Sequence, residues 1–332
     1  MLTEQPDRLR IFTWHIHGSY LFYLSQGDYD IFIPVNAEKT EGYYGRGETF
    51  PFGENVIEVA AAEVKNLTFD CILFQSNANY LEDQYEVLSE SQRFLPRIYV
   101  EHNTPVGHPT DTLHVVRDPA VVVVHVTHFN KLMWQNTTPI IKVIEHGVLK
   151  PVTRYTGKLN KGIVVINHIK ERGRITGWDI YEKVREHVPI DLVGMGTKAY
   201  GGLGEILHPQ LPEFISNYRF FFNPIRYTSF GLAVCEAMMA GMPVAALATT
   251  EYVSVIKNGI NGIINTDIEQ LIVGMNRLIN DPDFAFKMGE NAHDTAMEKF
   301  NIGRFTADWE AIFYLTIDYN NSIYEKANRI YQ

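Results

Sequence analysis

Residues Phe220–Thr250 read FFFNPIRYTSFGLAVCEAMMAGMPVAALATT, and this stretch decides the fold of the second half of the chain. Two short apolar runs, Arg219–Phe222 and Val244–Leu247, have the length and composition of buried strands. The segment between them, about residues 230–240, has the composition of a packed helix and ends at a glycine. A strand, a helix and a second strand in this order predict a unit of a parallel α/β sheet.

Glu236 is the only ionisable side chain between residues 230 and 241. An unpaired carboxylate in a packed helix would cost several kcal/mol, so we expect a bound hydrogen-bond donor to offset it. Ser229 is expected to cap the start of this helix and Gly241 to end it. The free amides of residues 230–232 would then face a phosphate. The alternative is a packed helix whose glutamate is neutralised by a neighbouring lysine or a backbone amide.

The composition describes a globular protein with two cores. The chain has 332 residues, of which 45% are hydrophobic and 20% charged, which favours two domains. The net charge of -10 argues against sequence-independent binding of nucleic acid. Cys71 and Cys235 are too few for a disulfide framework, which indicates a reducing compartment, the cytoplasm by default. Neither a signal pattern nor a membrane-spanning run is found, although peripheral attachment to the inner face of a membrane is compatible with the sequence.

Continuous apolar runs mark the other expected strands, and such runs indicate parallel strands covered by helices on both faces of the sheet. In the first half these are Arg10–Trp14, Asp30–Val35, Cys71–Gln75, Arg97–Glu101, Val121–Val126 and Ile140–Ile144. In the second half they are Ile163–Ile166, Ile190–Val193, Arg219–Phe222, Val244–Leu247 and Gly262–Ile264, with helices at about 178–187 and 230–240. The sequence therefore predicts two doubly wound, Rossmann-like α/β modules in succession.

Module bounds follow from composition. The polar, glycine-containing span Pro151–Lys161 is the expected joint, which gives modules over residues 1–150 and 151–305. Residues 267–332 read as helical, and the surplus of apolar positions near the end predicts that residues 306–332 pack back on the first module. Ligands of doubly wound sheets bind beyond the carboxyl ends of the strands, so we expect the two modules to face each other across a cleft there.

The segment Ser229–Val244, SFGLAVCEAMMAGMPV, closely resembles the donor-binding signature of GT-B glycosyltransferases, in particular the retaining enzymes of glycosyltransferase family 4. The resemblance implies that Glu236 accepts hydrogen bonds from both ribose hydroxyls of a nucleotide. It also implies that Gly231 and Leu232 offer their amides to the diphosphate. The turn Val193–Gly196 resembles the family's strand-end loop near the nucleobase.

The resemblance extends more loosely to the first module. Residues Ile16–Ser19, directly after the first expected strand, resemble the glycine loop that lets backbone approach the phosphates, with Gly18 at its centre. Residues Val100–Pro105 resemble the strand-end loop whose histidine, here His102, faces the donor sugar. Residues His146–Val148 resemble the segment that closes the first module, which would lie on the acceptor side.

Three positions depart from the family's pattern. Family members usually carry a glutamate eight residues before the ribose-binding one, where this chain has Thr228. The arginine and lysine that usually clamp the diphosphate are replaced by His168 and Thr176. Cations in and near the same loop are expected to supply that charge, with a solvated basic loop as the alternative. The expected donor site is therefore Gly18, Gly194, Met195, Arg172, Arg174, Arg226, Thr228, Ser229, Phe230, Gly231, Leu232 and Glu236, with His102 as the catalytic residue.

Two other patterns are weaker. Gly194, Gly196 and Ala199 match a dinucleotide-binding fingerprint on paper, but glycines and Pro209 break the helix that should follow at once. His15 and His17 are spaced for one face of a strand, yet a third ligand is missing nearby in the sequence, so we expect neither a metal nor another cofactor.

The resemblance implies a metal-independent, retaining transferase that moves a hexose from a uridine diphosphate sugar, UDP-glucose first, to a saccharide or lipid-linked acceptor in polysaccharide or glycoconjugate biosynthesis. The alternative is a non-catalytic GT-B relic that binds nucleotide sugars as a sensor or scaffold. Acceptor, linkage and oligomeric state are not readable from the sequence.

Overall fold

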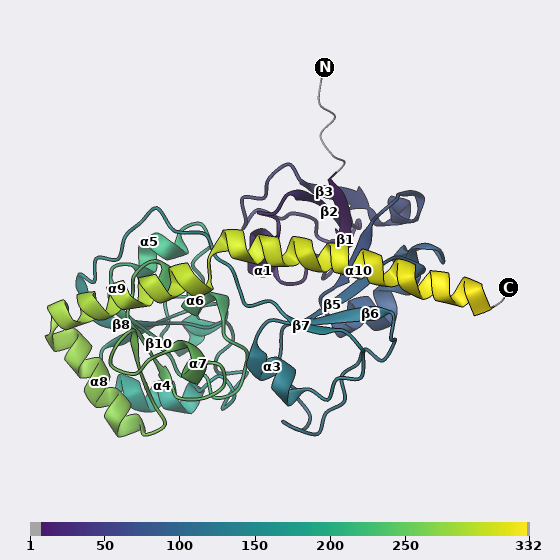
Figure 1. Ribbon diagram of the computed structural model, residues 1–332. Coiled ribbons are helices and arrows are strands. Elements are labelled where there is room, and N and C mark those ends of the chain that lie inside the picture. Colours follow the sequence, from purple (N-terminus) through teal and green to yellow (C-terminus); the bar gives the residue numbers. More distant parts are fainter. Residues whose placement is uncertain (1–7, 331–332) are drawn as a thin grey trace, which may run out of the picture. The chain divides into compact units, whose positions relative to one another are not determined.

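The computed structural model describes residues 8–330, and the chain divides into two compact units (Figure 1). Unit 1 comprises the chain up to Glu145 and again from Ile302, and unit 2 is His146–Asn301. These divisions lie at 145/146 and 301/302, where we expected 150/151 and 305/306. Residues 331 and 332 of the predicted terminal helix lie outside the described residues.

Unit 1 is built on a seven-stranded sheet of order β3-β2-β1-β4-β5-β6-β7, in which all neighbours are parallel. Its strands are β1 (Leu9–Thr13), β2 (Tyr29–Val35), β3 (Val56–Ala60), β4 (Cys71–Phe74), β5 (Arg97–Glu101), β6 (Val121–His125) and β7 (Ile141–Val143). Its helices are α1 (Gly18–Leu24), α2 (Gln84–Val87), α3 (His128–Met133) and α10 (Ile302–Ile330), with short turns of helix η1 (Ala61–Asn66), η2 (Asn79–Asp83) and η3 (Gln92–Phe94).

The six strands predicted for this half are confirmed to within one residue at each end. Apolar side chains dominate them, and only the edge strand β7 lacks a fully buried residue. The strand β3 was missed. It lies at the edge of the sheet, and only Val56 of its five residues is fully buried, so its sequence carries no continuous apolar run.

The long helix α10 packs on unit 1 although 156 residues of unit 2 precede it in the chain. Trp309 is fully buried, and its indole Nε1 donates a hydrogen bond to the Tyr20 hydroxyl of α1 at 3.1 Å. Figure 1 shows α10 in yellow running along α1. None of the helices in the described range combines the length and the apolar character needed to cross a membrane.

Unit 2 has a five-stranded parallel sheet of order β12-β11-β10-β8-β9. Its strands are β8 (Leu159–Val165), β9 (Ile190–Val193), β10 (Tyr218–Asn223), β11 (Val244–Leu247) and β12 (Gly262–Asn265). Its helices are α4 (Trp178–Arg185), the short turn η4 (Thr197–Tyr200), α5 (Leu211–Ile215), α6 (Leu232–Met239), α7 (Tyr252–Val255), α8 (Ile268–Asn280) and α9 (Pro282–Lys299). All five predicted strands are present, although β8 begins at Leu159 rather than Ile163.

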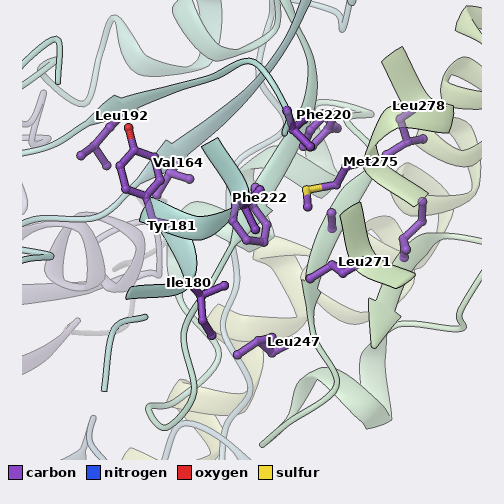
Figure 2. Packing of buried hydrophobic residues seen from close by; sticks show 14 of the residues in the cluster. Val164, Ile180, Tyr181, Leu192, Phe220, Phe222, Leu247, Leu271, Met275 and Leu278 are labelled. Carbon is purple, nitrogen blue, oxygen red and sulfur yellow. The ribbon is translucent and has the colours of Figure 1, made fainter. Parts of the chain in front are cut away.

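The core of unit 2 joins its sheet to the flanking helices. Figure 2 shows Phe222 of β10 among side chains that converge from neighbouring strands and from α4 and α8. The buried cluster includes Val164, Ile180, Tyr181, Leu192, Phe220, Leu247, Leu271, Met275 and Leu278. Burying large apolar side chains of this kind contributes roughly 1.5 to 3 kcal/mol each, which fixes the sheet whose edge carries the site.

The span Pro151–Lys161 belongs to unit 2, so its prediction as the joint between modules is wrong. The Tyr155 backbone N–H donates to the Ala240 carbonyl at 3.1 Å, and its hydroxyl donates to the Arg219 carbonyl at 2.7 Å. The Gly157 N–H donates to the Ser216 carbonyl at 3.2 Å. These bonds hold the polar span against the helices and strands of unit 2.

Candidate functional site

The connections at the carboxyl edge of the unit 2 sheet carry most of the predicted site. The helix α6 follows β10 there and begins at Leu232, with Gly231 in the N-cap position in an extended conformation. A side-chain cap is absent at this helix start, so the prediction that Ser229 caps it is wrong. The helix ends as predicted, because Gly241 follows its last turn with a φ of +87°.

The start of α6 presents open hydrogen-bond donors. Within residues 8–330, the backbone N–H groups of Phe230, Gly231, Leu232 and Ala233 have no acceptor. A Cβ placed on Gly231 would meet no atom within 4 Å, so the space beside the Cα of this residue is open. Because the positive end of the helix dipole coincides with these N–H groups, an anion is favoured there.

The Glu236 carboxylate lies in the second turn of α6, and its side chain is 8% exposed. The His208 Nε2 atom lies 3.0 Å from Glu236 Oε1. The protein itself therefore offers this carboxylate a donor, besides any donor of a bound ligand. This partner is an imidazole, whereas the alternative considered from the sequence was a lysine or a backbone amide.

Two of the three predicted arginines share one carboxylate. Arg226 donates to both oxygens of Asp179, at 2.6 and 2.7 Å, and Arg174 donates to Oδ2 at 2.7 Å. The hydrogen bond from Arg226 lowers the pKa of Asp179 below its ordinary value. Two guanidinium groups against one carboxylate leave one positive charge near the loop that leads to α6.

The third arginine, Arg172, lies in the loop after β8, and its exposed side chain has no acidic partner among the residues that the structure describes. The Nζ atom of Lys170, in the same loop, lies 4.1 Å from the centre of the Tyr200 ring. His168 is exposed and has a φ of +52°. Thr176 is fully buried, and its hydroxyl donates to the Ile169 carbonyl at 2.9 Å, so its side chain serves the loop's own structure.

The other residues predicted at this edge, Gly194, Met195 and Thr228, make local contacts within the unit. Gly194 has a φ of +141°, and a Cβ there would lie 2.4 Å from the Ile166 carbonyl oxygen, so close packing requires the glycine. The Met195 N–H donates to the Asn167 side chain at 2.9 Å, which occupies it. The Thr228 hydroxyl donates to the Ser229 carbonyl at 3.0 Å. After β9 only the short turn η4 follows, which confirms that the dinucleotide fingerprint lacks its helix.

The two predicted residues of unit 1 lie at the carboxyl edge of its own sheet. The His102 ring follows β5 and lies 4.2 Å from the His17 ring, centre to centre, and 4.6 Å from the Tyr20 ring. Burial lowers the pKa of His17 to about 4. Gly18 begins α1, and a Cβ there would lie 2.4 Å from Phe50 Cε2, so a larger residue would force the Phe50 ring to move.

A buried polar network holds the turn that carries His102. Glu101 Oε1 accepts a hydrogen bond from the Asn103 N–H at 2.7 Å, and Glu101 Oε2 lies 3.3 Å from His114 Nε2. The Asn103 carbonyl accepts from the Trp134 indole at 2.8 Å. His114 Nδ1 accepts from the Val116 N–H at 3.1 Å, which leaves the Nε2 side of the ring facing the Glu101 carboxylate.

Sequence reasoning missed three residues of these edges: His208, Asp179 and Glu101. Asp179 had a signal, since a carboxylate in the first turn of α4 follows a basic loop. Glu101 had one as well, because it ends a buried strand directly before His102. His208 had none, since it stands in an irregular turn 28 residues before Glu236.

Two parallel-sheet α/β units, with seven and five strands, match the fold of GT-B glycosyltransferases. Residues 202–295 match the family model described as "Glycosyl transferases group 1". This range contains His208, Gly231 and Glu236, so the matched segment carries the central part of the candidate site. A search of curated proteins gives no match.

Solved structures of three proteins illustrate the likeness. Sucrose-phosphate synthase from Thermosynechococcus elongatus superposes with a TM-score of 0.67 and 13% identity over 93% of this chain and 99% of its own. HepE from Anabaena, solved with UDP and glucose, gives a TM-score of 0.67 and 14% identity over 93% and 100%. A variant of S. aureus TarM, solved with fondaparinux, alpha-GlcNAc-glycerol and UDP, gives 0.60 and 14% over 76% and 58%, so this chain spans less than two thirds of TarM. At such identities the likeness shows the fold alone.

Proposed function

We propose that this protein is a glycosyltransferase that moves a hexose from a UDP-sugar to a saccharide or lipid-linked acceptor, without a metal ion and with retention at the transferred carbon. UDP-glucose is the proposed donor, and polysaccharide or glycoconjugate biosynthesis is the proposed setting. The match of residues 202–295 to the family model described as "Glycosyl transferases group 1" and the GT-B fold support the class of reaction.

One observation carries the proposal: a buried carboxylate lies one turn into a helix whose first N–H groups are open. The Glu236 side chain is 8% exposed, and the N–H groups of residues 230–233 have no acceptor in the described part of the chain. A nucleoside diphosphate matches both features, since its ribose hydroxyls donate hydrogen bonds and its phosphates accept them. Glu236 takes the ribose, and the start of α6 takes the diphosphate.

The proposed chemistry needs stabilisation of a leaving diphosphate more than it needs a base. As the bond between the sugar carbon and the phosphate oxygen breaks, negative charge grows on the diphosphate, and N–H groups and cations stabilise it. Arg172, together with the net charge of the Arg174, Arg226 and Asp179 cluster, supplies the cations. The leaving oxygen of the diphosphate then takes the proton of the acceptor hydroxyl, and the oxygen of that hydroxyl bonds to the sugar carbon. The role of His102 is to orient the sugar.

The donor is proposed from the solved relatives. HepE was solved with UDP and glucose and also with UDP-glucose, and TarM with UDP and saccharide ligands. These ligands favour uridine as the base and a hexose as the transferred group. The two cysteines of the chain, Cys71 and Cys235, are free thiols, which supports a cytoplasmic location.

The test is release of UDP from UDP-glucose. We expect slow hydrolysis without an acceptor and faster UDP release when an acceptor saccharide is added. Binding of UDP, ADP and GDP by calorimetry identifies the base in the same experiment series. If no sugar nucleotide binds, the proposed function is wrong.

A second candidate, a non-catalytic nucleotide-sugar sensor or scaffold, is favoured by the altered cation positions. Thr176 stands where the family carries a diphosphate cation, and it is fully buried with its hydroxyl bonded to the loop. Tight binding of UDP-glucose with no UDP release under any acceptor would establish this candidate instead.

A further inference from the structure

The connection between η4 and α5 turns one imidazole inward. The His208 side chain is 14% exposed, whereas Leu207, Pro209 and Gln210 around it are exposed. The N–H groups of Gln210 and Leu211 donate to the Leu207 carbonyl at 2.9 and 3.1 Å, which forms the turn that opens α5. The turn therefore fixes the direction in which His208 points.

The imidazole of His208 meets the carboxylate of Glu236 on α6. The ionised carboxylate only accepts hydrogen bonds, so His208 Nε2–H donates across the 3.0 Å separation to Oε1. Both side chains are largely screened from water, at 14% and 8% exposure, which strengthens a charge-assisted bond. A carboxylate offers roughly four lone-pair sites, and this bond uses one of them.

We propose that His208 is a positioning residue of the nucleotide site, which fixes the plane of the Glu236 carboxylate so that its further lone pairs accept the two ribose hydroxyls. This inference rests on the proposed function, which assigns the ribose to Glu236. A glutamate held in one orientation before binding loses less side-chain freedom when the nucleotide arrives. The bond from His208 therefore raises affinity for the ribose without contacting the nucleotide.

Calorimetric titration with UDP and with 2′-deoxy-UDP tests this role. We expect His208→Ala to weaken UDP binding about three- to tenfold, the range of one hydrogen bond, and His208→Gln to recover most of the loss through its amide donor. The loss for 2′-deoxy-UDP should be smaller, because that ligand lacks one of the hydroxyls that the carboxylate accepts. His187→Ala is the matched control, since this exposed histidine lies just after α4, and it should leave both affinities unchanged.

The outcomes separate this inference from the function on which it rests. Equal losses for the two nucleotides would show a merely structural role, and unchanged or tighter UDP binding in His208→Ala would show that the imidazole competes with the ribose. Either result overturns the inference while UDP binding by the unaltered protein, weakened in Glu236→Ala, keeps the function. Absence of UDP binding by the unaltered protein overturns both.

The pair itself is testable without a nucleotide and without a destabilising truncation. In protein labelled with ¹⁵N-histidine, the His208 signal is identified by its loss in His208→Gln. We expect Glu236→Gln to shift the His208 Nε2 resonance and to leave that of His187 in place. An unshifted His208 signal would show that the bond does not exist, which overturns the inference even where His208→Ala fails to fold.

Discussion

Two glycines at the starts of helices, one in each unit, have opposite surroundings. Gly18 begins α1 after β1, and a Cβ there would lie 2.4 Å from Phe50 Cε2. Gly231 precedes α6 after β10, and a Cβ there would meet no atom within 4 Å. Unit 1 therefore uses this glycine for packing, whereas unit 2 uses it to keep space open. A glycine after a strand does not by itself indicate a ligand site. The atoms around its Cα show whether a side chain there would clash or would enter open space.

The polar groups at the carboxyl edges of the two sheets also differ, in how far they are bonded within their own unit. In unit 1, the Asn103 N–H donates to Glu101 and the Trp134 indole donates to the Asn103 carbonyl, and these two bonds hold the turn around His102. In unit 2, the N–H groups that begin α6 have no acceptor in residues 8–330. The turn at the first edge is held by bonds within the unit, whereas the second edge presents open donors of the kind that an anion accepts from.

The largest expected effect concerns the packing of α10 on unit 1. Trp309→Ala removes a fully buried indole and its bond to Tyr20, so we expect it to lower the stability of unit 1 by about 3 to 5 kcal/mol. Urea unfolding followed by fluorescence measures this in a Trp178→Phe background, where every remaining tryptophan belongs to unit 1. Calorimetry on the folded variant should give an unchanged UDP affinity, and a changed one would break the separation of roles between the units.

A smaller effect is expected from acid. His125 is fully buried, and burial lowers its pKa from 6.5 to about 4. Between these values the unfolded chain binds a proton that the folded one does not, so stability falls as the pH falls, by about 1 kcal/mol per pH unit from this group. Urea unfolding of unit 1 at neutral pH and near pH 5 measures the slope. His125→Asn should reduce the slope and leave the part that His17 contributes, and an equal slope in that variant would assign the effect to groups other than His125.

The next effect distinguishes the two glycines directly. Gly18→Ala forces Phe50 to move, so we expect a loss of about 1 kcal/mol in the stability of unit 1 with no change in UDP affinity. The same fluorescence and calorimetric measurements apply. A variant as stable as the unaltered protein but weakened in UDP binding would mean that Gly18 serves the ligand after all.

The smallest effect on stability is expected at the other glycine. Gly231→Ala places a methyl group in open space at a backbone conformation that alanine adopts, so stability should change by less than about 0.5 kcal/mol. The methyl group occupies space proposed for the diphosphate, so UDP affinity should fall about tenfold. Unchanged affinity would remove the distinction between the two glycines.

The sequence predicted most of the fold because parallel strands are buried on both faces and therefore read as apolar runs. It missed β3, where only Val56 is buried, and it placed a joint at Pro151–Lys161, where polar composition concealed hydrogen bonds to unit 2. A polar segment has the same kind of composition whether its backbone bonds to a neighbouring helix or to water, so composition does not distinguish a packed segment from a linker.

The site was predictable only in part. A single carboxylate in an apolar helix marked Glu236, but its bond to His208 joins residues 28 apart and has no local pattern. The three arginines were visible in the sequence as charges. In the structure Arg174 and Arg226 pair with Asp179, whereas Arg172 has no acidic partner within the described residues. This distribution depends on side-chain packing, which the sequence does not display. Ser229 was predicted as a cap from residue type alone, whereas the chain turns into the helix two residues later.

The central claim is that the carboxylate and the open N–H groups of α6 together hold a nucleoside diphosphate. Calorimetric titration of UDP into the unaltered protein and into Glu236→Ala measures it most directly. The account predicts binding that is weakened about ten- to a hundredfold in the variant, as loss of hydrogen bonds to a charged group requires. Affinities equal within about twofold, in a variant that remains folded, would contradict it.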